Sequence, residues 1–206
     1  MLENKLGINN EIELAKEEER ITKLKALELF DTNKINEFEV GTTKGLCEIH
    51  KFLFSDIYLF AGKIREVNLS KGNFRFASSI YLKDVLSKID SMKEDTFEDI
   101  IKKYVEMNVA HPFREGNGRS TRIWLDMILK TRISKVVDWS KINKEEYLLA
   151  MERSPIKDTE IKLLLKEALT DKINDRTLYM KGIDVSYKYE GYNVYTMNEL
   201  DKTRES

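Results

Sequence analysis

Twelve consecutive residues, HPFREGNGRSTR at positions 111–122, combine side chains that suit chemistry on a nucleoside triphosphate. The imidazole of His111 titrates in a range that suits a general base near neutral pH. Gly116 and Gly118 let the backbone come close to an anion and adopt conformations that other residues avoid. Together they predict a base that removes a proton from a hydroxyl beside a phosphate-binding loop.

Three charged side chains extend this prediction. Arg119 and Arg122 are three residues apart, which would put both guanidinium groups on one helix face, and guanidinium groups match phosphate oxygens well. Glu115 supplies one carboxylate, and Mg²⁺ in nucleotide sites commonly takes one or two carboxylates, with phosphates and water completing its shell. A lone glutamate would otherwise be a solvated loop residue, so its assignment depends on the neighbouring glycines and arginines.

Two predicted helices would position this stretch. The segment Phe97–Ala110 has helical spacing, with Thr96 or, as a competitor, Asp95 as its cap, and Pro112 disfavours helical geometry at the residue before it. A second helix is expected over residues 117–133. Its free N–H groups and its positive dipole end would face the loop, where they favour phosphate.

The composition predicts an all-α, mainly helical fold for one domain of residues 1–206, because glycine and proline are scarce (9 and 2 residues) and 41% of the residues are hydrophobic. Only Arg65–Ala77 departs from helical spacing. Its residues alternate with period two on either side of Ser70–Asn73, which predicts one short β-hairpin. Further helices are expected over Asn10–Leu29, Thr43–Phe54, Ile80–Ile89, Lys144–Arg153, Thr159–Asp171 and, with Asp184 as cap, about 184–191, followed by a partly disordered tail.

The charge balance argues against direct nucleic-acid binding. The chain has 35 basic and 36 acidic residues and a net charge of −1, whereas nucleic-acid binders are usually basic. No apolar run approaches the length of a membrane span and the first 20 residues lack a signal-peptide pattern, so the expected location is the cytoplasm. The single cysteine, Cys47, excludes a disulfide within the chain.

Three segments resemble the Fic family. Residues 111–122 match its signature HPF-x-[DE]-GNGR-x-x-R. Residues 50–65, HKFLFSDIYLFAGKIR, are similar to its H-x-x-[LF]-F-x-x-I-Y-x-[WF]-A-G-x-x-R element, and Met151–Pro155 is similar to a segment after the core helices. The resemblance therefore covers a core of about 42–155.

This resemblance implies an activity. Most Fic proteins transfer AMP from ATP to a hydroxyl of a target protein, with release of pyrophosphate. His111 would then be the base that deprotonates the hydroxyl, and Glu115 would hold Mg²⁺. Kinase-like relatives, which resemble the Doc toxins, have lysine at the second glycine of the signature, and Gly118 argues against that chemistry.

The resemblance also assigns the ATP phosphates. Gly116, Asn117 and Gly118 would form the anion hole for the α- and β-phosphates. Arg119 would contact the β-phosphate, and Arg122 would bind the γ-phosphate and orient ATP for AMP transfer. Phosphocholine transferases share the scaffold, but two intact arginines favour a triphosphate.

The predicted hairpin lies where the family has its target-docking flap. Lys71, Gly72, Asn73 and Phe74 would form the tip of this flap. An extended segment of the target would pair with its edge by strand addition. The alternative is a purely structural hairpin.

A final motif resembles an internal brake. SYKYEG at 186–191 is similar to the family's inhibitory pattern [ST]-x-x-x-E-[GN], in the subclass that carries it at the C-terminus. Ser186 and Glu190 would share a helix face, and Glu190 could pair with Arg122 and block the γ-phosphate site. Tyr187 would be a candidate for self-modification once the helix is released.

Two other functions stay open from the sequence. One is an enzyme of the same fold that mainly removes AMP, with Glu190 positioning a water molecule. The other is a nucleotide-binding module without catalysis. The expected partners are ATP and a target protein, with type II topoisomerase subunits as candidates by analogy. Self-association into a homo-oligomer that pins the last helix would be a second layer of control.

Overall fold

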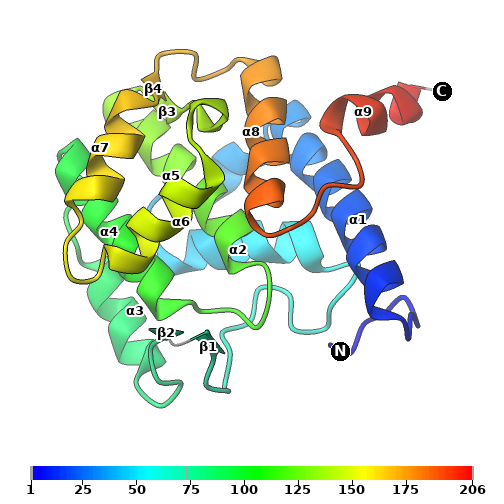
Figure 1. Cartoon of the computed structure of the whole chain (residues 1–206), viewed down its shortest axis with the longest axis horizontal. Helices are drawn as coiled ribbons and strands as arrows, with labels where there is room; N and C mark the ends of the chain where they lie inside the picture. The colour runs from blue at the N-terminus through cyan, green and yellow to red at the C-terminus, as the bar shows by residue number, and fades with distance from the viewer. Residues whose placement is uncertain (1, 73, 206) are drawn as a thin grey trace.

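The long helix α5 (Asn117–Ile133) lies at the centre of the molecule (Figure 1). The structure is a computed structural model that describes residues 2–72 and 74–205. Helices α2 (Thr43–Phe54), α4 (Phe97–Ala110) and α8 (Arg176–Tyr189) pack directly on α5. The fold is helical, as predicted, and α5 carries the second half of the 111–122 stretch into its core.

The other helices form the outer parts of the molecule. On one side, α1 (Glu11–Asp31) packs against α2, α8 and α9 (Met197–Glu205). On the other side lie α3, α4, α6 and α7 (Figure 1). The remaining elements are the 3₁₀ helices Lys34–Glu37 and Trp139–Lys141, α3 Leu82–Asp90, α6 Lys144–Arg153, α7 Thr159–Glu167, β1 Ser70–Lys71, β2 Phe74–Arg75, β3 Val136–Val137 and β4 Leu169–Thr170. None of the described helices has the length and apolar character that a membrane span requires.

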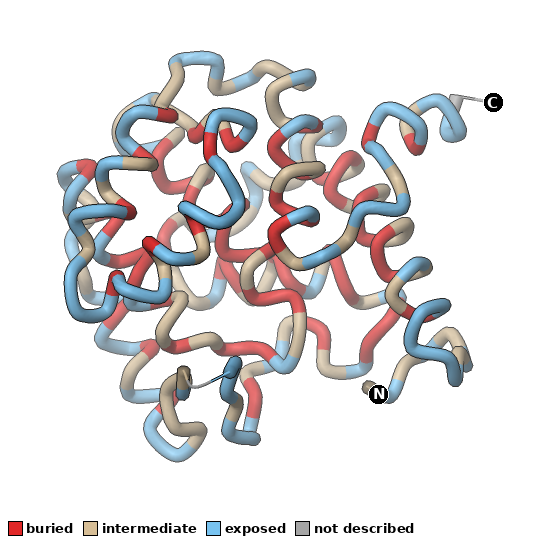
Figure 2. Tube along the Cα trace, viewed as in Figure 1, coloured by how far each residue is buried: buried red, intermediate tan, exposed pale blue. Residues whose placement is uncertain are grey.

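Burial concentrates on the faces that meet α5 (Figure 2). Trp124, Leu125 and Ile128 on α5 are fully buried and belong to one hydrophobic core. Arg119 and Arg122 are also buried on the same helix. Because a buried charge needs paired partners, this helix must bring its arginines to acceptors inside the protein.

Local capping signals placed several helix starts correctly. The Thr42 side chain accepts from Gly45 N–H at the start of α2, and Asn143 caps α6. Thr96 caps α4, and Asp99 bonds back to it to complete a capping box. These contacts lie within three residues of one another, which is why the sequence alone predicts them.

The hairpin is shorter than predicted and its pairing is shifted toward the tip. Ser70 pairs with Arg75 and Lys71 with Phe74, so the predicted turn residues Ser70 and Lys71 are strand residues. The Val67 carbonyl instead accepts from Arg65, which directs that segment toward α4 rather than along the ladder. The tip prediction for Asn73 lies outside the described residues.

The C-terminal predictions need three corrections. The helix expected over 184–191 begins at Arg176, because Asp175 caps it by accepting from Leu178 N–H. Asp184 lies inside that helix and pairs with Lys23. The tail expected to be partly disordered contains α9, which packs on α1.

A second two-stranded sheet escaped the sequence analysis. Strands β3 and β4 pair Val136 with Thr170 and Val137 with Leu169, across about thirty residues of chain. The helix predicted over Thr159–Asp171 therefore ends at Glu167. Two-residue strands carry too little alternation to be detected before their partner is known.

Candidate active site

His111 ends α4 in a left-handed conformation, with φ of 49°. Its imidazole stacks on Phe76 of the hairpin, with ring centroids 3.6 Å apart and planes 12° from parallel. Burial lowers the pKa of His111 to about 4, although the Glu190 carboxylate acts to raise it. The imidazole is therefore neutral at neutral pH and able to accept a proton.

The loop after His111 is held by two side chains. Asn117 bonds to both the N–H and the carbonyl of Phe113, each at 2.8 Å. His50 Nε2 lies 2.9 Å from the Glu115 carbonyl, and Gly62 N–H donates to His50 Nδ1. Because Nδ1 accepts, the proton of the neutral ring is on Nε2 and donates to Glu115. The loop geometry is thus set from α2 and α5 before any ligand binds.

The start of α5 has no side-chain cap. Gly116 is its N-cap residue, with φ of 74°, and a Cβ there would lie 2.3 Å from the Phe54 ring. Glycine is required both by this conformation and by this contact. The first-turn N–H groups of α5 receive no cap from that residue, which leaves them for an anion.

The Glu190 carboxylate lies at the start of α5. Its Oε1 would lie 2.1 Å from a Cβ placed on Gly118, so the carboxylate covers the first turn of α5. Arg122 Nη2 donates to Glu190 Oε1 at 2.8 Å. Burial alone would raise the pKa of Glu190, but Arg122, with smaller contributions from Arg119 and Lys71, lowers it below its ordinary value. The carboxylate is therefore ionised where a phosphate could sit.

Ser186 completes the contact between α8 and α5. Arg122 donates through Nε to Ser186 Oγ at 2.7 Å and through Nη2 to the Ser186 carbonyl at 2.9 Å. The guanidinium carbon lies 5.8 Å from the Tyr147 ring centroid and 5.3 Å from that of Tyr189. Arg122 thus lies against the Tyr147 and Tyr189 rings, which stack on each other, and it is bonded to both residues that the sequence singled out at the end of α8.

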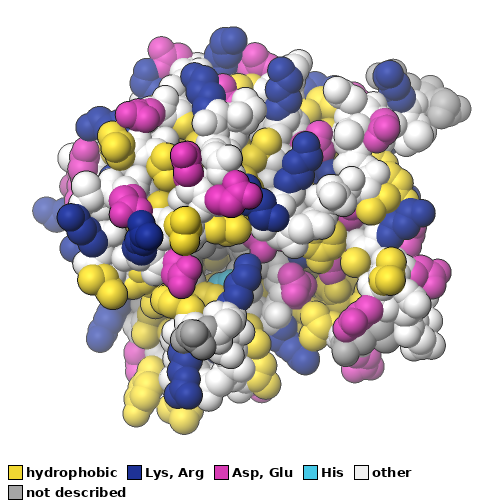
Figure 3. All heavy atoms as spheres, in the orientation of Figure 1, with side chains coloured by type: hydrophobic (Ala, Val, Ile, Leu, Met, Phe, Trp, Pro, Cys, Tyr) yellow, Lys and Arg dark blue, Asp and Glu magenta, His cyan; other side chains and the backbone are white. Residues whose placement is uncertain are grey.

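A pocket of about 450 Å³ opens beside these groups. Figure 3 shows a histidine side chain at the floor of a hollow above the hairpin. The pocket walls come from α4, α5, α6, the end of α8 and the hairpin. The predicted site residues that line the pocket are His111, Gly118, Arg122, Glu190, Lys71, Gly72 and Phe74.

Arg119 faces a different environment from Arg122. Its Nη1 forms an ion pair with Glu18 Oε1 at 2.7 Å, and its Nη2 donates to Glu115 Oε1 at 3.1 Å. Its guanidinium carbon lies 4.5 Å from the centroid of the Tyr192 ring. Arg119 is 1% exposed and does not line the pocket. The structure therefore places Arg122 at the pocket and Arg119 behind it, and the contact of both with one phosphate chain stays a prediction.

Glu18, on α1, is a site-supporting residue that the sequence analysis missed. Besides pairing with Arg119 it accepts from the hydroxyls of Tyr58 and Tyr192. Burial alone would raise the pKa of Glu18, but Arg119 and these hydroxyls lower it below its ordinary 4.5. Glu18 lies about one hundred residues before Arg119, so no local pattern could have identified the pair.

We expect Glu18→Ala to lower the free energy of unfolding by roughly 3–5 kcal/mol, because it leaves the buried Arg119 charge without its main partner. Urea titration at pH 7 measures the change. Glu17→Ala is the matched control, since Glu17 and Arg20 form a partly exposed pair on the same helix and surface pairs contribute about 0–1 kcal/mol. Equal losses in the two variants would contradict this account.

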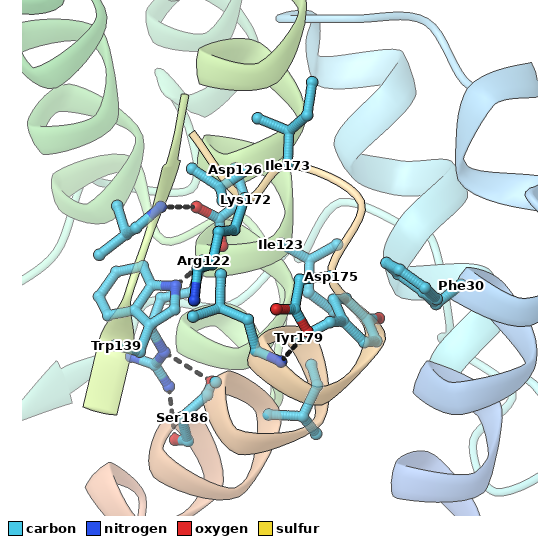
Figure 4. A pocket seen from close by; sticks show the side chains of 15 residues that line it. Phe30, Arg122, Ile123, Asp126, Trp139, Lys172, Ile173, Asp175, Tyr179 and Ser186 are labelled. Carbon is cyan, nitrogen blue, oxygen red and sulfur yellow. Dashed lines mark hydrogen bonds between the residues drawn. The ribbon is translucent and has the colours of Figure 1, made fainter. Parts of the chain in front are cut away.

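A small cavity of about 60 Å³ lies behind Arg122, between α5, β3 and α8 (Figure 4). There Asp126 accepts from Val137 N–H and from Trp139 Nε1, both at 2.8 Å. Burial raises the pKa of Asp126 to about 7. A Cβ on Gly182 would lie 3.2 Å from Trp139, so this indole packs closely on α8. Asp126 thereby holds Trp139 on the surface against which α8 packs.

Tyr187 is buried in this structure. It is 1% exposed, and its ring lies 5.3 Å from the Arg119 guanidinium carbon. Self-modification of this residue would require the end of α8 to leave its site first.

Comparisons with known proteins point to the same family as the sequence motifs. A model of the Fic/DOC family matches residues 41–129. The chain is 28% identical to "Protein adenylyltransferase VbhT" of Bartonella schoenbuchensis, over 93% of this chain and 44% of that protein. It is 27% identical to "Probable protein adenylyltransferase Fic" of Salmonella typhimurium, over 83% of this chain and 88% of that protein. The chain thus spans less than half of the first relative and most of the second.

Solved structures show the same fold. The crystal structure of the BepC protein from Bartonella tribocorum, which has AMPPNP bound, superposes with a TM-score of 0.66 and 20% identity, covering 82% of this chain and 92% of that one. The N-terminal FIC domain of Bep8 from Bartonella sp. 1-1C gives a TM-score of 0.70 and 19% identity, covering 84% and 92%.

Proposed function

The chain belongs to the Fic domain family, and on that premise we propose that it is a protein adenylyltransferase that its own Glu190 holds inactive. The observation that carries the proposal is one pocket lined by His111, Gly118 and Arg122, with the Glu190 carboxylate paired to Arg122 inside it. A base, a helix start and a guanidinium around one space suit a nucleotide and a hydroxyl.

The proposed reaction is transfer of AMP from ATP to a Tyr, Ser or Thr hydroxyl. His111 takes the hydroxyl proton while the oxygen attacks the α-phosphorus. The bond from that phosphorus to the bridging oxygen breaks, and pyrophosphate leaves with its electron pair. The first-turn N–H groups of α5 stabilise the charge on the phosphates, and Arg122 fixes the γ-phosphate. Positioning and charge stabilisation supply the catalysis.

Glu115 is the residue we propose for Mg²⁺. Among the described residues no three His, Cys, Asp or Glu side chains gather as an all-protein metal site. A single carboxylate is nevertheless enough for an ion that takes its other ligands from phosphates and water. The Glu115 side chain is 41% exposed, and its contacts with Gly116 N–H and Arg119 both use Oε1. When bound, the ion would neutralise phosphate charge.

Removal of AMP is the second candidate. Glu190 and His111 line the same pocket, so a carboxylate stands where a water molecule could be activated against an AMP-modified hydroxyl. The two functions differ in their product from a pre-modified target, because only the second releases free AMP. Type II topoisomerase subunits, proposed by analogy, are the first purified targets to test in both directions.

Labelled ATP tests the proposed function. We expect Glu190→Gly to transfer label from α-³²P-ATP, but not from γ-³²P-ATP, to protein in a bacterial lysate with Mg²⁺. Glu167→Gly, at the exposed end of α7, is the matched control and should behave like wild type. Retention of γ-label would indicate a kinase. No label in any lane, with AMP released from a pre-modified target, would favour the second candidate.

A further inference from the structure

The Arg65 guanidinium is buried among backbone carbonyls. It donates through Nε to the His111 carbonyl at 2.7 Å and through Nη1 to that of Val67 at 2.6 Å. Through Nη2 it donates to the carbonyls of Ala77, at 2.6 Å, and Ala110, at 3.1 Å. Arg65 is 3% exposed. One side chain therefore joins the end of α4 to the segments on both sides of the hairpin.

The backbone repeats this connection. Arg65 N–H donates to the Pro112 carbonyl at 2.8 Å, and Ala77 N–H donates to the Val109 carbonyl at 3.0 Å. These acceptors lie at the C-terminus of α4 and just beyond it, where carbonyls lack helical partners and a cation is favoured. The hairpin has only two residues in each strand, which would not hold its own position in water. Its placement thus depends on these bonds.

Arg65 is committed to backbone carbonyls rather than to the pocket. Four of its five guanidinium N–H groups donate to carbonyls, and the residue does not line the pocket. A two-pronged contact with a nucleotide phosphate would require some of these bonds to break. Any effect of Arg65 on the reaction must therefore be indirect, through the segments whose carbonyls it bonds.

Those segments carry the base and the flap. The His111 carbonyl is fixed by Arg65, and its ring is fixed by Phe76 on the hairpin. Three charged groups act on the imidazole of His111: Glu190 from the end of α8, Arg65 from the segment before the hairpin, and Lys71 from β1 of the hairpin. After burial and Glu190, the Arg65 charge is the next influence on the pKa of His111, and it acts to lower that pKa.

We propose that Arg65 is a positioning residue for the transfer: its guanidinium fixes the His111 base and the target-docking flap relative to each other. The inference rests on the proposed function, because it takes His111 as the base and the hairpin as the flap. A target hydroxyl presented by the flap then meets the imidazole at a set distance and angle. A misplacement of about 1 Å in such a geometry can reduce the rate by roughly 10²-fold.

Arg65→Lys in the Glu190→Gly background tests the proposal. Lysine keeps the charge but concentrates its donors on one atom, so it cannot span the four carbonyls. We expect kcat/KM for the target protein to fall by roughly 10²-fold, while the Kd for ATP changes by less than about threefold. Arg20→Lys on α1, whose guanidinium pairs with Glu17, is the matched control and should match its parent.

Two further readouts do not depend on activity. Exchange of the Ala77 amide hydrogen should accelerate in Arg65→Lys. The Ala77 carbonyl loses its bond from the guanidinium, so the bond from Ala77 N–H to the Val109 carbonyl opens more often. In Arg65→Met, the pKa of His111 measured by NMR should rise, whereas Arg65→Lys should keep it low. If Arg65→Met does not fold, the lysine variant still decides the question through exchange and kinetics.

The outcomes separate the two proposals. If the Glu190→Gly parent transfers no AMP, the proposed function fails, while the exchange and pKa measurements still report whether Arg65 fixes the flap and His111. If the parent is active and Arg65→Lys retains kcat/KM within about threefold, with unchanged Ala77 exchange, the positioning role is wrong. Equal losses of ATP affinity and kcat/KM would also overturn it, because they would indicate nucleotide binding.

Discussion

Replacing Glu190 by glycine is expected to raise the rate of AMP transfer by roughly 10²-fold to a few 10³-fold. The γ-phosphate can pair with Arg122 only after the carboxylate has left it. A buried charge pair resists separation by about 3–5 kcal/mol, and every 1.4 kcal/mol is about tenfold. Initial rates at saturating target, with ATP varied, measure the change.

The rest of α8 should stay docked in this variant. Lys23 holds Asp184, and Arg176 pairs with Asp31 and Asp201. These contacts lie one or more turns before Glu190, which is the C-cap residue of α8, a position next to one where glycine is common. The variant therefore removes the carboxylate without removing the helix.

Two controls sharpen the result. Glu190→Gln keeps the size of the side chain and removes its charge, so its rate should lie between those of wild type and Glu190→Gly. Arg122 loses its ionic partner in either variant, and ATP should raise the melting temperature of the variants more than that of wild type. Equal transfer rates for wild type and both variants would show that Glu190 is not a brake.

The second large effect is expected from His111→Ala in the Glu190→Gly background. A positioned general base contributes roughly 10²–10⁴-fold, so AMP transfer should fall by that factor. The ATP affinity should change little, because the imidazole is not assigned to the phosphates. Single-turnover transfer and ATP binding by calorimetry separate the two effects.

The pH dependence gives an independent check of the base. Because burial lowers the pKa of His111 to about 4, the imidazole is mostly neutral from about pH 5 upward. Loss of the Glu190 charge lowers this pKa further, since that carboxylate acts to raise it. The rate should therefore be flat from about pH 5 to 7, whereas a decline centred near 6.5 would indicate an unperturbed histidine. An unchanged rate in His111→Ala would point to another base.

Local rules explain what the sequence predicted correctly. Pro112 ends α4 just before the loop, Thr96 caps its start, and Gly116 precedes the first turn of α5. Each of these signals depends only on residues a few positions apart, so it can be recognised from the sequence without knowing the fold. The same holds for the placement of Ser186 and Glu190 about one turn apart at the end of α8.

The directions of the two arginine side chains were decided by tertiary packing and not by local sequence signals. Arg119 and Arg122 are three residues apart on one helix, yet Glu18 draws the first toward α1 and Glu190 pairs with the second at the pocket. The direction of a long side chain depends on which acceptors the folded protein brings near it. That choice is made by elements more than sixty residues away.

The sequence by itself determined the helical fold, the loop between α4 and α5, and the set of groups that could handle a nucleotide, because caps, glycines and helical spacing act over a single turn. Only the tertiary structure decided that Glu190 lies over Gly118 and that Arg65 joins His111 to the hairpin. These arrangements depend on burial, which requires partners from distant segments to meet before any contact is favourable.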